Sequence, residues 1–513
     1  MKKGTYCVMI DCSRNGVMNV GALKRFIKII ADMGYNALML YTEDVYEVEG
    51  EEYFGLFRGR YTSEEIAEIH DFAAACGVEL IPCIQTLAHL DTLLRWHAYE
   101  DVRDCDDCLL VDEDKTYGLI ERMICSVSKH FKSKRLHLGL DEAYSVGKGK
   151  YFERHGHEKQ EELFARHCEK VAQIAQKHGF SPIIWGDIAV NCDVNINGCT
   201  VCWDYYTEDA VTFEEKLLSY KGKDGGVWYA GGIITWLGYA PYNRFSSGVI
   251  DTHISVCKKH SVDNFIVTLW GDDGKECSYF SALPALFSAI KNWKGEVVEE
   301  SKPEFESITG VAYDDMLLLD CVNDVGEDIK WQNPNKYLLY QDVLLGIYDS
   351  TVDKSIYPRQ FAKTAQMLDS CAKKGVFSYL FEAASALCRV LEIKSVIGIK
   401  TREAYRKGSK DELKRLFVEY GELKKRIEEF YYLFKSLWYN ENKGVGFEVI
   451  DIRLGGLLAR VSHASELISD FVEGKIAKVD ELEEKSAVYY SSEFIGKAVY
   501  APKYRDIVTA NRL

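Results

Sequence analysis

The sequence predicts an α/β fold, a (β/α)8 TIM barrel, followed by an all-α C-terminal domain. Two observations carry this prediction. Before about residue 310, eight short runs rich in Val, Ile and Leu alternate with amphipathic segments, a pattern typical of a parallel sheet covered by helices. Later in the chain the strand-like runs thin out and long helical patterns dominate. We therefore expect the barrel over residues 1–310 and the helical domain over residues 330–513.

The elements of the barrel follow from local signals. Asn19 is expected to cap a helix that Gly34 ends, and Ser63 is expected to cap a helix with Ile66 and Ile69 on its apolar face. An open dinucleotide-binding sheet is the alternative, but no Gly-x-Gly-x-x-Gly follows the first strand. The eight strands are expected at residues 6–11, 37–41, 78–84, 136–138, 182–185, 200–203, 227–230 and 265–270.

The helical domain shows one long apolar stripe. Its members recur at spacings of three and four, with Lys and Glu opposite, so we expect it to pack on the barrel or on a partner subunit as a homodimer. Residues 442–456 are too glycine-rich and charged for a plain helix, and are expected to form a turn on the barrel or a loop that reaches a functional site. The stripe comprises Leu413, Leu416, Phe417, Tyr420, Leu423, Ile427, Tyr431, Phe434 and Leu437.

Composition excludes several classes of partner. A net charge of −16 disfavours binding to nucleic acid, whose phosphates need a basic surface. No stretch approaches the ~20 apolar residues of a membrane span, and the apolar run at residues 6–10 is too short for a signal peptide. The 16 cysteines are scattered, as expected for reduced thiols. We expect a cytoplasmic protein that binds neither membrane nor nucleic acid.

No metal or cofactor site is expected. Cys105-x-x-Cys108 and Cys199-x-x-Cys202 could in principle hold zinc, but residues three apart at the start of a strand point to opposite faces, so ordinary thiols are favoured. His137 and Asp141 share no predictable ligand geometry. The sequence also lacks a phosphate-binding loop and a Gly-x-Ser-x-Gly nucleophile motif at a strand end.

The residues that could carry chemistry follow the strands, where a barrel places its reacting groups. Asp141 and Glu142 come directly after the fourth strand, and paired acids beside apolar neighbours are candidates for acid–base catalysis. Arg14 and His89 also follow strands, although each could instead be a structural ion pair or a core histidine. Tryptophans at several strand ends, interleaved with polar groups, are typical of a carbohydrate pocket.

His137-Leu-Gly-Leu-Asp-Glu142 resembles the His-x-Gly-Gly-Asp-Glu signature of family 20 glycoside hydrolases, the β-N-acetylhexosaminidases. The string from Leu140 to Tyr151 is similar to that of bacterial cytoplasmic N-acetyl-β-D-glucosaminidases. Leu140 departs from the signature in replacing its second glycine, which is expected to alter packing rather than chemistry. The resemblance covers the barrel and continues into the helical tail.

The resemblance implies roles for individual residues. Arg14 would hold the outer hydroxyls of the sugar, and Glu43 would pair with His89 near the catalytic residues. Tyr229 would bond the acetamido oxygen, and Asp272 the far hydroxyls. The aromatic walls would be Trp185, Trp203 and Trp270.

The mechanism implied by the resemblance is substrate-assisted and retaining. The 2-acetamido oxygen would attack C1 to give an oxazolinium ion, Glu142 would act as acid and then base, and Asp141 would orient the acetamido nitrogen. The backbone must turn between these neighbours for both to reach the sugar. The expected substrate is a small oligosaccharide or glycoside with a terminal β-linked N-acetylglucosamine.

Other hypotheses stay open from the sequence. N-acetylgalactosamine is the second candidate sugar, and the residues that touch O4 would discriminate. A silent sugar-binding barrel would require the loss of one acid, yet both are present. A divalent-metal barrel enzyme predicts loss of activity with a chelator. The linkage, the aglycone and the oligomeric state are not determined by the sequence.

Overall fold

A computed structural model describes residues 4–192, 194, 196–220, 226–326, 330–372 and 375–511. The chain divides into two compact units. The first comprises Met1–Ile233, Ser246–Trp270 and Ala285–Ser301, and the second comprises Ile234–Phe245, Gly271–Pro284 and Lys302–Leu513. The segments that follow the last two barrel strands therefore group with the helical region.

The first unit is a closed barrel of eight parallel strands in sequential order, which confirms the predicted fold class. Each strand pairs with the next, and β1 pairs with β8 in register from Tyr6 opposite Phe265 to Ile10 opposite Leu269. The strands are β1 Tyr6–Asp11, β2 Ala37–Tyr41, β3 Glu79–Cys83, β4 Arg135–His137, β5 Ser181–Trp185, β6 Cys199–Trp203, β7 Val227–Gly232 and β8 Phe265–Leu269.

Alternate residues of the strands fill the barrel interior. Because side chains of a strand alternate between its two faces, Trp228 and Ala230 of β7 point inward while Tyr229 points outward. Every residue of this interior cluster is buried. The cluster comprises Cys7, Met9, Ala37, Met39, Tyr41, Ile81, Cys83, Ile183, Trp185, Val201, Trp228, Ala230 and Ile266. The barrel is thus a packed core with its chemistry confined to the ends of the strands.

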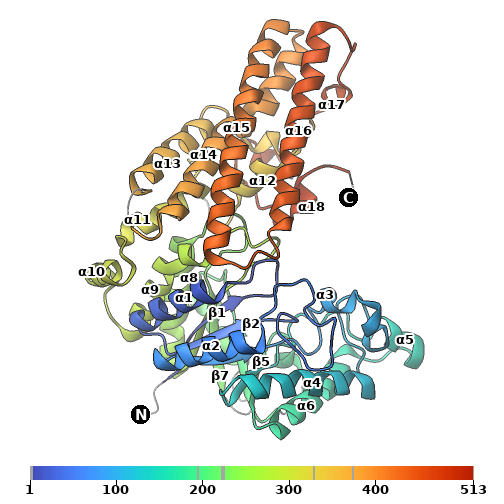
Figure 1. Ribbon diagram of the computed structural model, residues 1–513, viewed down its shortest axis with the longest axis vertical. Coiled ribbons are helices and arrows are strands. Elements are labelled where there is room, and N and C mark those ends of the chain that lie inside the picture. The colour runs from blue at the N-terminus through green and yellow to red at the C-terminus, as the bar shows by residue number, and fades with distance from the viewer. Residues whose placement is uncertain are drawn as a thin grey trace. The chain divides into compact units, whose positions relative to one another are not determined.

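Helices lie outside the strands (Figure 1). Asn19 caps the first by accepting from the Ala22 amide, and Gly34 ends it in the left-handed conformation, as the sequence predicts. Thr62 rather than Ser63 caps the second, with Glu65 completing a capping box. The helices are α1 Val20–Met33, α2 Ser63–Ala75, α3 Asp91–Leu94, α4 Asp114–His130, α5 Lys150–His155, α6 Gln160–Lys177, α7 Ala210–Ser219, α8 Asn243–Lys259 and α9 Leu283–Lys294.

One of the expected connections departs from the alternating pattern. Between β5 and β6, the described residues form only a 3-10 turn, Ala189–Asn191, instead of a full helix. Gly186 follows directly after β5, and a β-carbon there would lie 2.3 Å from the Tyr220 ring. The ring of Tyr220 therefore packs against the end of β5.

The second unit is dominated by long helices, and the all-α prediction is confirmed. Helix α14 packs against α13 and α15, and α15 packs against α16 (Figure 1). Among the described residues no helix is both long and apolar enough to cross a bilayer. The helices of this region are α10 Val298–Thr309, α11 Tyr313–Leu317, α12 Pro334–Tyr340, α13 Tyr357–Cys371, α14 Ser378–Arg406, α15 Lys410–Glu441, α16 Glu448–Glu473, α17 Asp480–Glu483 and α18 Tyr504–Ile507.

The apolar stripe of α15 is narrower than the sequence suggests. Phe417 is 47% exposed, and Phe430, which the pattern omitted, is 1% exposed. Trp438 and Glu441 are buried near the C-terminal end of the helix, and the eight buried positions before them alternate strictly between spacings of three and four, as in the seam of a coiled coil. The eight are Leu413, Leu416, Tyr420, Leu423, Ile427, Phe430, Phe434 and Leu437.

The expectation of a turn or loop over residues 442–456 is wrong for most of that segment. Helix α15 ends at Glu441, and α16 begins at Glu448 and runs through Gly455 and Gly456. Each glycine costs about 1 kcal/mol in a helix interior relative to alanine. Burial of Ile450 and Leu454 on the same helix offsets that cost, since each fully buried apolar side chain contributes about 1.5–3 kcal/mol.

We predict that Gly455→Ala stabilises the protein by about 0.5–1 kcal/mol, because the position is helical and exposed and a β-carbon there meets nothing within 4 Å. The measurement is urea denaturation of the variant beside the parent. The matched control is Gly474→Ala at the end of α16, which has equal space but a φ of +79° and should destabilise. Equal effects of the two substitutions would contradict this explanation.

Candidate active site

The chain turns sharply where β4 ends. Gly139, Leu140 and Glu142 all have positive φ, at 75°, 72° and 50°. A β-carbon at position 139 would lie 2.1 Å from Gln85 Oε1 and 2.7 Å from the Ile84 carbonyl oxygen, so only glycine fits there. Leu140 stands in the left-handed region where a second glycine would be relaxed. The expected turn between Asp141 and Glu142 is confirmed.

The side chain of Gln85, at the end of β3, fixes the first of the two acids. Its Nε2 donates to Asp141 Oδ1 at 2.6 Å and to the Tyr41 hydroxyl at 2.8 Å, while its Oε1 accepts from the Leu140 amide at 3.1 Å. Gln85 is fully buried, and Asp141 is 8% exposed. The carboxylate of Asp141 is therefore held in one orientation at the mouth of the barrel.

Both acids converge on one nitrogen. His89 Nε2 lies 3.4 Å from Asp141 Oδ2 and 3.4 Å from Glu142 Oε2. Burial lowers the pKa of His89, but bonds to Asp141 and Glu142 and the negative charges around it outweigh burial and raise that pKa to about 11. His89 is thus a cation between two carboxylates and not a neutral core histidine.

The two acids differ in how deeply they are buried and in what else binds them. Burial would raise the pKa of Asp141, yet hydrogen bonds from His89 and Gln85 and the charge of His89 lower it overall, so Asp141 is ionised. The Glu142 side chain, in contrast, is 48% exposed. Its backbone amide donates to Asp187 Oδ2 at 3.0 Å, which fixes the turn while leaving the carboxyl free to approach a ligand.

A second carboxylate layer lies behind the first. Glu43 is 1% exposed, its Oε1 lies 3.7 Å from Arg14 Nη1, and it accepts from the Tyr41 hydroxyl at 3.2 Å. Burial raises the pKa of Glu43 to about 8, against the opposing charges of Arg14 and His89. Arg14 also lies 3.6 Å from Asp11 Oδ2, and its side chain is 29% exposed. Arg14 is both a salt-bridging residue and accessible to a ligand.

Aromatic side chains that follow or end β5, β6 and β8 contact one another. Trp185 is 1% exposed and lies 6.0 Å from Trp270, and Trp270 Nε1 donates to the Tyr205 hydroxyl at 3.1 Å. Tyr205 in turn stacks on Trp203 at 5.3 Å. The buried Nε1 of Trp185 has no hydrogen-bond partner among the described residues. A buried donor of this kind is suited to a ligand oxygen.

The structure does not bring two of the predicted site residues into this cluster. Tyr229 does not join the cluster, because strand alternation turns it outward, where its hydroxyl bonds His253 Nδ1 at 2.9 Å and its ring packs on Phe213. Asp272 belongs to the second unit, so its place relative to the cluster stays a prediction. The cluster comprises Arg14, Glu43, His89, Asp141, Glu142, Trp185, Trp203 and Trp270.

Three residues that contact the cluster were given no role from the sequence. Gln85 orients Asp141, and Asp187 accepts from the Glu142 amide. Burial raises the pKa of Asp187 to about 6. Tyr205 joins the aromatic side chains, because its hydroxyl accepts from Trp270 Nε1 and its ring stacks on Trp203. The sequence places all three just after strands, where a barrel carries its reacting groups, but it does not show the tertiary contacts that give each its role.

The described residues contain no group of three or more His, Cys, Asp or Glu side chains arranged to hold a metal ion. His137, in the middle of the signature, is fully buried, and burial lowers its pKa to about 3. It accepts from the Gly139 amide through Nδ1 at 3.1 Å and packs on Trp185. The cluster offers an ionised acid, an accessible acid and aromatic surface, which suits acid–base chemistry on a sugar.

Several known proteins are similar in sequence to part of this chain. Human hexosaminidase D is 29% identical over 221 residues, which cover 39% of this chain and 45% of the human protein. The bovine hexosaminidase D is 25% identical over 226 residues, covering 40% and 64%. The Arabidopsis thaliana beta-hexosaminidase 3 is 26% identical over 212 residues, covering 38% and 39%. The chain spans less than two thirds of each relative.

Solved structures resemble the chain more distantly. A beta-N-acetylhexosaminidase from Bacteroides fragilis superposes with a TM-score of 0.49 at 17% identity, over 64% of this chain and 75% of that one. An exo beta-N-acetylglucosaminidase from Vibrio harveyi in complex with N-acetylglucosamine gives 0.47 at 14% identity, over 60% and 58%.

Two family models match along the chain. The catalytic domain of glycosyl hydrolase family 20 matches residues 6–216, which contain the turn after β4 and most of the cluster. The Glycoside Hydrolase 20C C-terminal domain matches residues 313–499. Since these two matches together span more than three quarters of the sequence, the chain belongs to glycoside hydrolase family 20.

Proposed function

We propose that this chain is an exo-acting β-N-acetylhexosaminidase that releases terminal β-linked N-acetylglucosamine with retention of configuration, by substrate-assisted catalysis. The observation that carries the proposal is the pair Asp141 and Glu142, whose carboxylates each lie 3.4 Å from His89 Nε2. Family membership and relatives named as hexosaminidases support the sugar class. The proposed substrates are small oligosaccharides or glycosides.

The first step uses the 2-acetamido group of the substrate as the nucleophile. Its carbonyl oxygen attacks C1 while the bond between C1 and the leaving oxygen breaks, and Glu142 donates its proton to that oxygen. The nitrogen of the resulting oxazolinium ion carries positive charge. Asp141, held ionised by His89 and Gln85, accepts the N–H and stabilises that charge as it develops.

The second step reverses the first with water in place of the leaving group. Glu142, now a carboxylate, takes a proton from a water molecule as the water oxygen bonds to C1. The bond between C1 and the acetamido oxygen breaks, and its electrons restore the neutral amide. Two inversions at C1 give net retention. Asp141 serves no covalent role, which fits a carboxylate fixed by two neighbouring residues, His89 and Gln85, rather than one free to attack.

The surrounding residues would set the sugar preference. Arg14, 29% exposed and anchored by Asp11 and Glu43, would bond the outer hydroxyls, and Tyr205 would bond the acetamido group in place of Tyr229. Trp203 and Trp270, which are partly buried, would stack on the apolar face of the ring, and Trp185 would support Trp270 from the core. Whether the enzyme also accepts N-acetylgalactosamine depends on the groups near O4. A cytoplasmic location and a homodimer through the helical unit remain predictions, tested by cell fractionation and by light scattering.

The first prediction concerns substrate choice. Aryl β-N-acetylglucosaminide should be hydrolysed and the plain aryl β-glucoside should be inert, because only the former carries the nucleophile. The measurement is release of the phenol from the glucosaminide, the galactosaminide and the glucoside, with and without a chelator. Turnover of the glucoside would indicate a protein nucleophile, and loss of activity with chelator would favour a metal enzyme.

The second prediction separates the roles of the two acids. Glu142→Gln should lower kcat by about 10²–10⁴-fold for substrates with poor leaving groups and leave binding largely intact, because the variant cannot donate a proton. Asp141→Asn should instead impair 2-acetamido sugars whatever the leaving group. The comparison is kcat and KM for an aryl glycoside and a natural disaccharide. Glu153→Gln, on the exposed face of α5, is the control and should be silent. Full activity of Glu142→Gln would overturn the assignment.

The third prediction concerns the charge on His89. Because its pKa in the folded protein, about 11, lies above the ordinary value, the stabilisation it supplies is complete below about pH 6.5 and is lost as pH rises towards 11. The imidazole nitrogen shifts of His89 should therefore stay constant between about pH 5 and 9 in an NMR titration. His137, neutral throughout that range, is the internal reference. A midpoint near neutrality for His89 would contradict the ionic arrangement.

A further inference from the structure

The turn after β8 has an unusual backbone. Asp273, Gly274 and Lys275 follow one another with φ of 50°, 118° and 49°, and the Lys275 amide closes the turn by donating to the Gly271 carbonyl at 3.0 Å. Left-handed conformations at two non-glycine residues, Asp273 and Lys275, on either side of Gly274 are strained, and such strain persists only where the surroundings impose it. Asp272 lies inside this turn. The whole segment Gly271–Pro284 belongs to the helical unit.

Two buried cations from that unit impose the conformation. Lys336 of α12 is 0% exposed, and its Nζ lies 2.7 Å from Asp273 Oδ2, 2.9 Å from Glu276 Oε2 and 3.0 Å from the Asp273 carbonyl oxygen. Arg453 of α16 donates through Nη1 to the same carbonyl and to Glu276 Oε1, both at 2.8 Å. Its Nη2 reaches Asp273 Oδ1 at 3.2 Å.

Further contacts lock the same residues. A β-carbon at Gly274 would lie 2.3 Å from Arg453 Nη1, so the guanidinium occupies the space that a side chain would take. The Tyr504 amide donates to Asp273 Oδ2 at 2.7 Å, and the Tyr504 ring lies beneath Arg453 at 4.4 Å. Residues from three helices, α12, α16 and α18, therefore meet on one aspartate. We call Lys336, Arg453, Asp273 and Glu276 the ion cluster.

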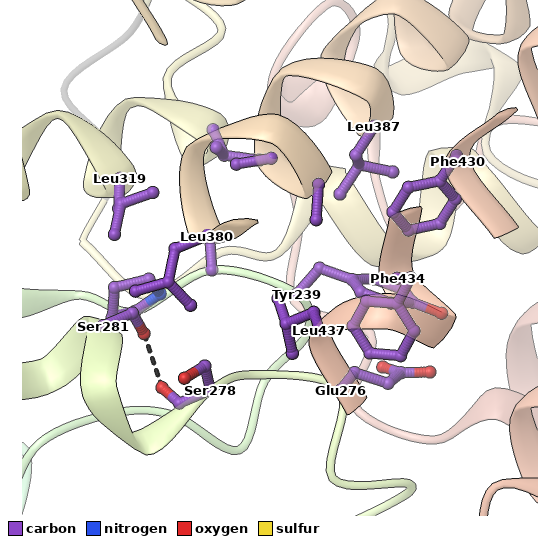
Figure 2. A pocket seen from close by; sticks show the side chains of 15 residues that line it. Tyr239, Glu276, Ser278, Ser281, Leu319, Leu380, Leu387, Phe430, Phe434 and Leu437 are labelled. Carbon is purple, nitrogen blue, oxygen red and sulfur yellow. Dashed lines mark hydrogen bonds between the residues drawn. The ribbon is translucent and has the colours of Figure 1, made fainter. Parts of the chain in front are cut away.

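The other end of the segment is packed rather than ionic. Ser278 donates to Glu441 at 2.6 Å, and Ser281 donates to the Ser278 carbonyl at 2.6 Å. Figure 2 shows Glu276 and Ser278 on one side of a cavity whose other walls are apolar side chains of α14 and α15. Its volume of about 30 Å³ holds a water molecule or two and no sugar. This cavity is packing space and not a ligand site.

We propose that Lys336 and Arg453 are positioning residues for Asp272, because they hold the adjacent Asp273 and so fix the backbone that carries the Asp272 carboxylate. This inference rests on the proposed function, which gives Asp272 its contact with the hydroxyls of the sugar. The ion cluster fixes both the carbonyl and the carboxylate of Asp273, the residue adjacent to Asp272. Asp272 has little backbone freedom, because Asp273 beside it is held by Lys336 and Arg453. The hydrogen bond from the Lys275 amide to the Gly271 carbonyl also closes the turn around it.

The choice of ions over apolar side chains supports positioning rather than stability alone. Replacing a buried ion pair by well-packed apolar residues is often neutral or stabilising, so such a cluster is weak evidence for a purely stabilising role. Ionic contacts to a carbonyl and a carboxylate fix direction, which apolar contacts do not. The fixed direction here is that of a strained turn carrying a predicted ligand residue.

The first test reads the turn without using activity. Lys336→Met should accelerate amide hydrogen exchange in a peptide covering residues 271–277, because the strained turn relaxes when its cation is lost. The matched control is Lys394→Met. Lys394 is also buried, at 2% exposed, in the same unit, but its Nζ binds the carbonyls of Leu338 and Gln341. The control should leave exchange at residues 271–277 unchanged. Unaltered exchange in Lys336→Met would overturn the proposal.

The second test is kinetic. Lys336→Met should raise KM for an aryl N-acetylglucosaminide about tenfold and change kcat by less than about threefold, as displacement of a binding group predicts. Asp272→Asn should raise KM in the same way, and the double variant should be no worse than Asp272→Asn alone. If the two effects multiply, Lys336 does not act through Asp272 and the proposal is overturned.

A conservative variant keeps the test decisive where Lys336→Met does not fold. Arg453→Lys retains a charge on Glu276 but loses the fork that reaches the Asp273 carbonyl, and should give a KM between those of the parent and Arg453→Met. A KM equal to that of the parent in both Arg453 variants would overturn the proposal. Inactivity of the parent on every N-acetylhexosaminide would instead refute the proposed function, while the exchange experiment would still decide whether the ion cluster holds the turn.

Discussion

The positive charge of His89 is the interaction on which the site depends. Burying carboxylates at the mouth of a barrel is costly unless a cation accompanies them, and His89 lies within 3.4 Å of both Asp141 and Glu142. Its charge also opposes the effect of burial on Glu43. The two acids share this charge, and their environments differ because Asp141 is buried and bonded by Gln85 whereas the Glu142 side chain is 48% exposed.

Backbone strain is concentrated at the same place. Glu43, His89, Leu140 and Glu142 all have positive φ, and each follows a strand directly or closely. A strand that continued straight would alternate its side chains and send one of two neighbours away from the barrel mouth. The strained turns thus convert a regular sheet into a set of converging side chains, and the hydrogen bonds of Gln85 and Asp187 keep them there.

The strands and the two adjacent acids could be predicted from the sequence, but the direction in which strand side chains point could not. Asn19, Gly34 and the apolar runs are local signals, so the elements they mark were predictable. Tyr229 was misplaced because an inward and an outward residue of a buried strand are both apolar or aromatic, and periodicity does not distinguish them. Helix α16 was missed because Gly455 and Gly456 weaken the local signal, while the burial that overrides them is tertiary. Gln85 acts through a contact with a residue 56 positions away, which no local pattern contains.

The way the segments divide between the units has an evolutionary consequence. The connections Ile234–Phe245 and Gly271–Pro284 follow β7 and β8, yet they group with the helical unit, where Asn335 bonds the Tyr239 amide and Glu441 bonds Ser278. A barrel severed from its C-terminal region would keep all eight strands but lose the packing partners of two connecting segments. The helical region is therefore not an interchangeable module. Recombination that swaps it for an unrelated domain would have to replace both connections at the same time.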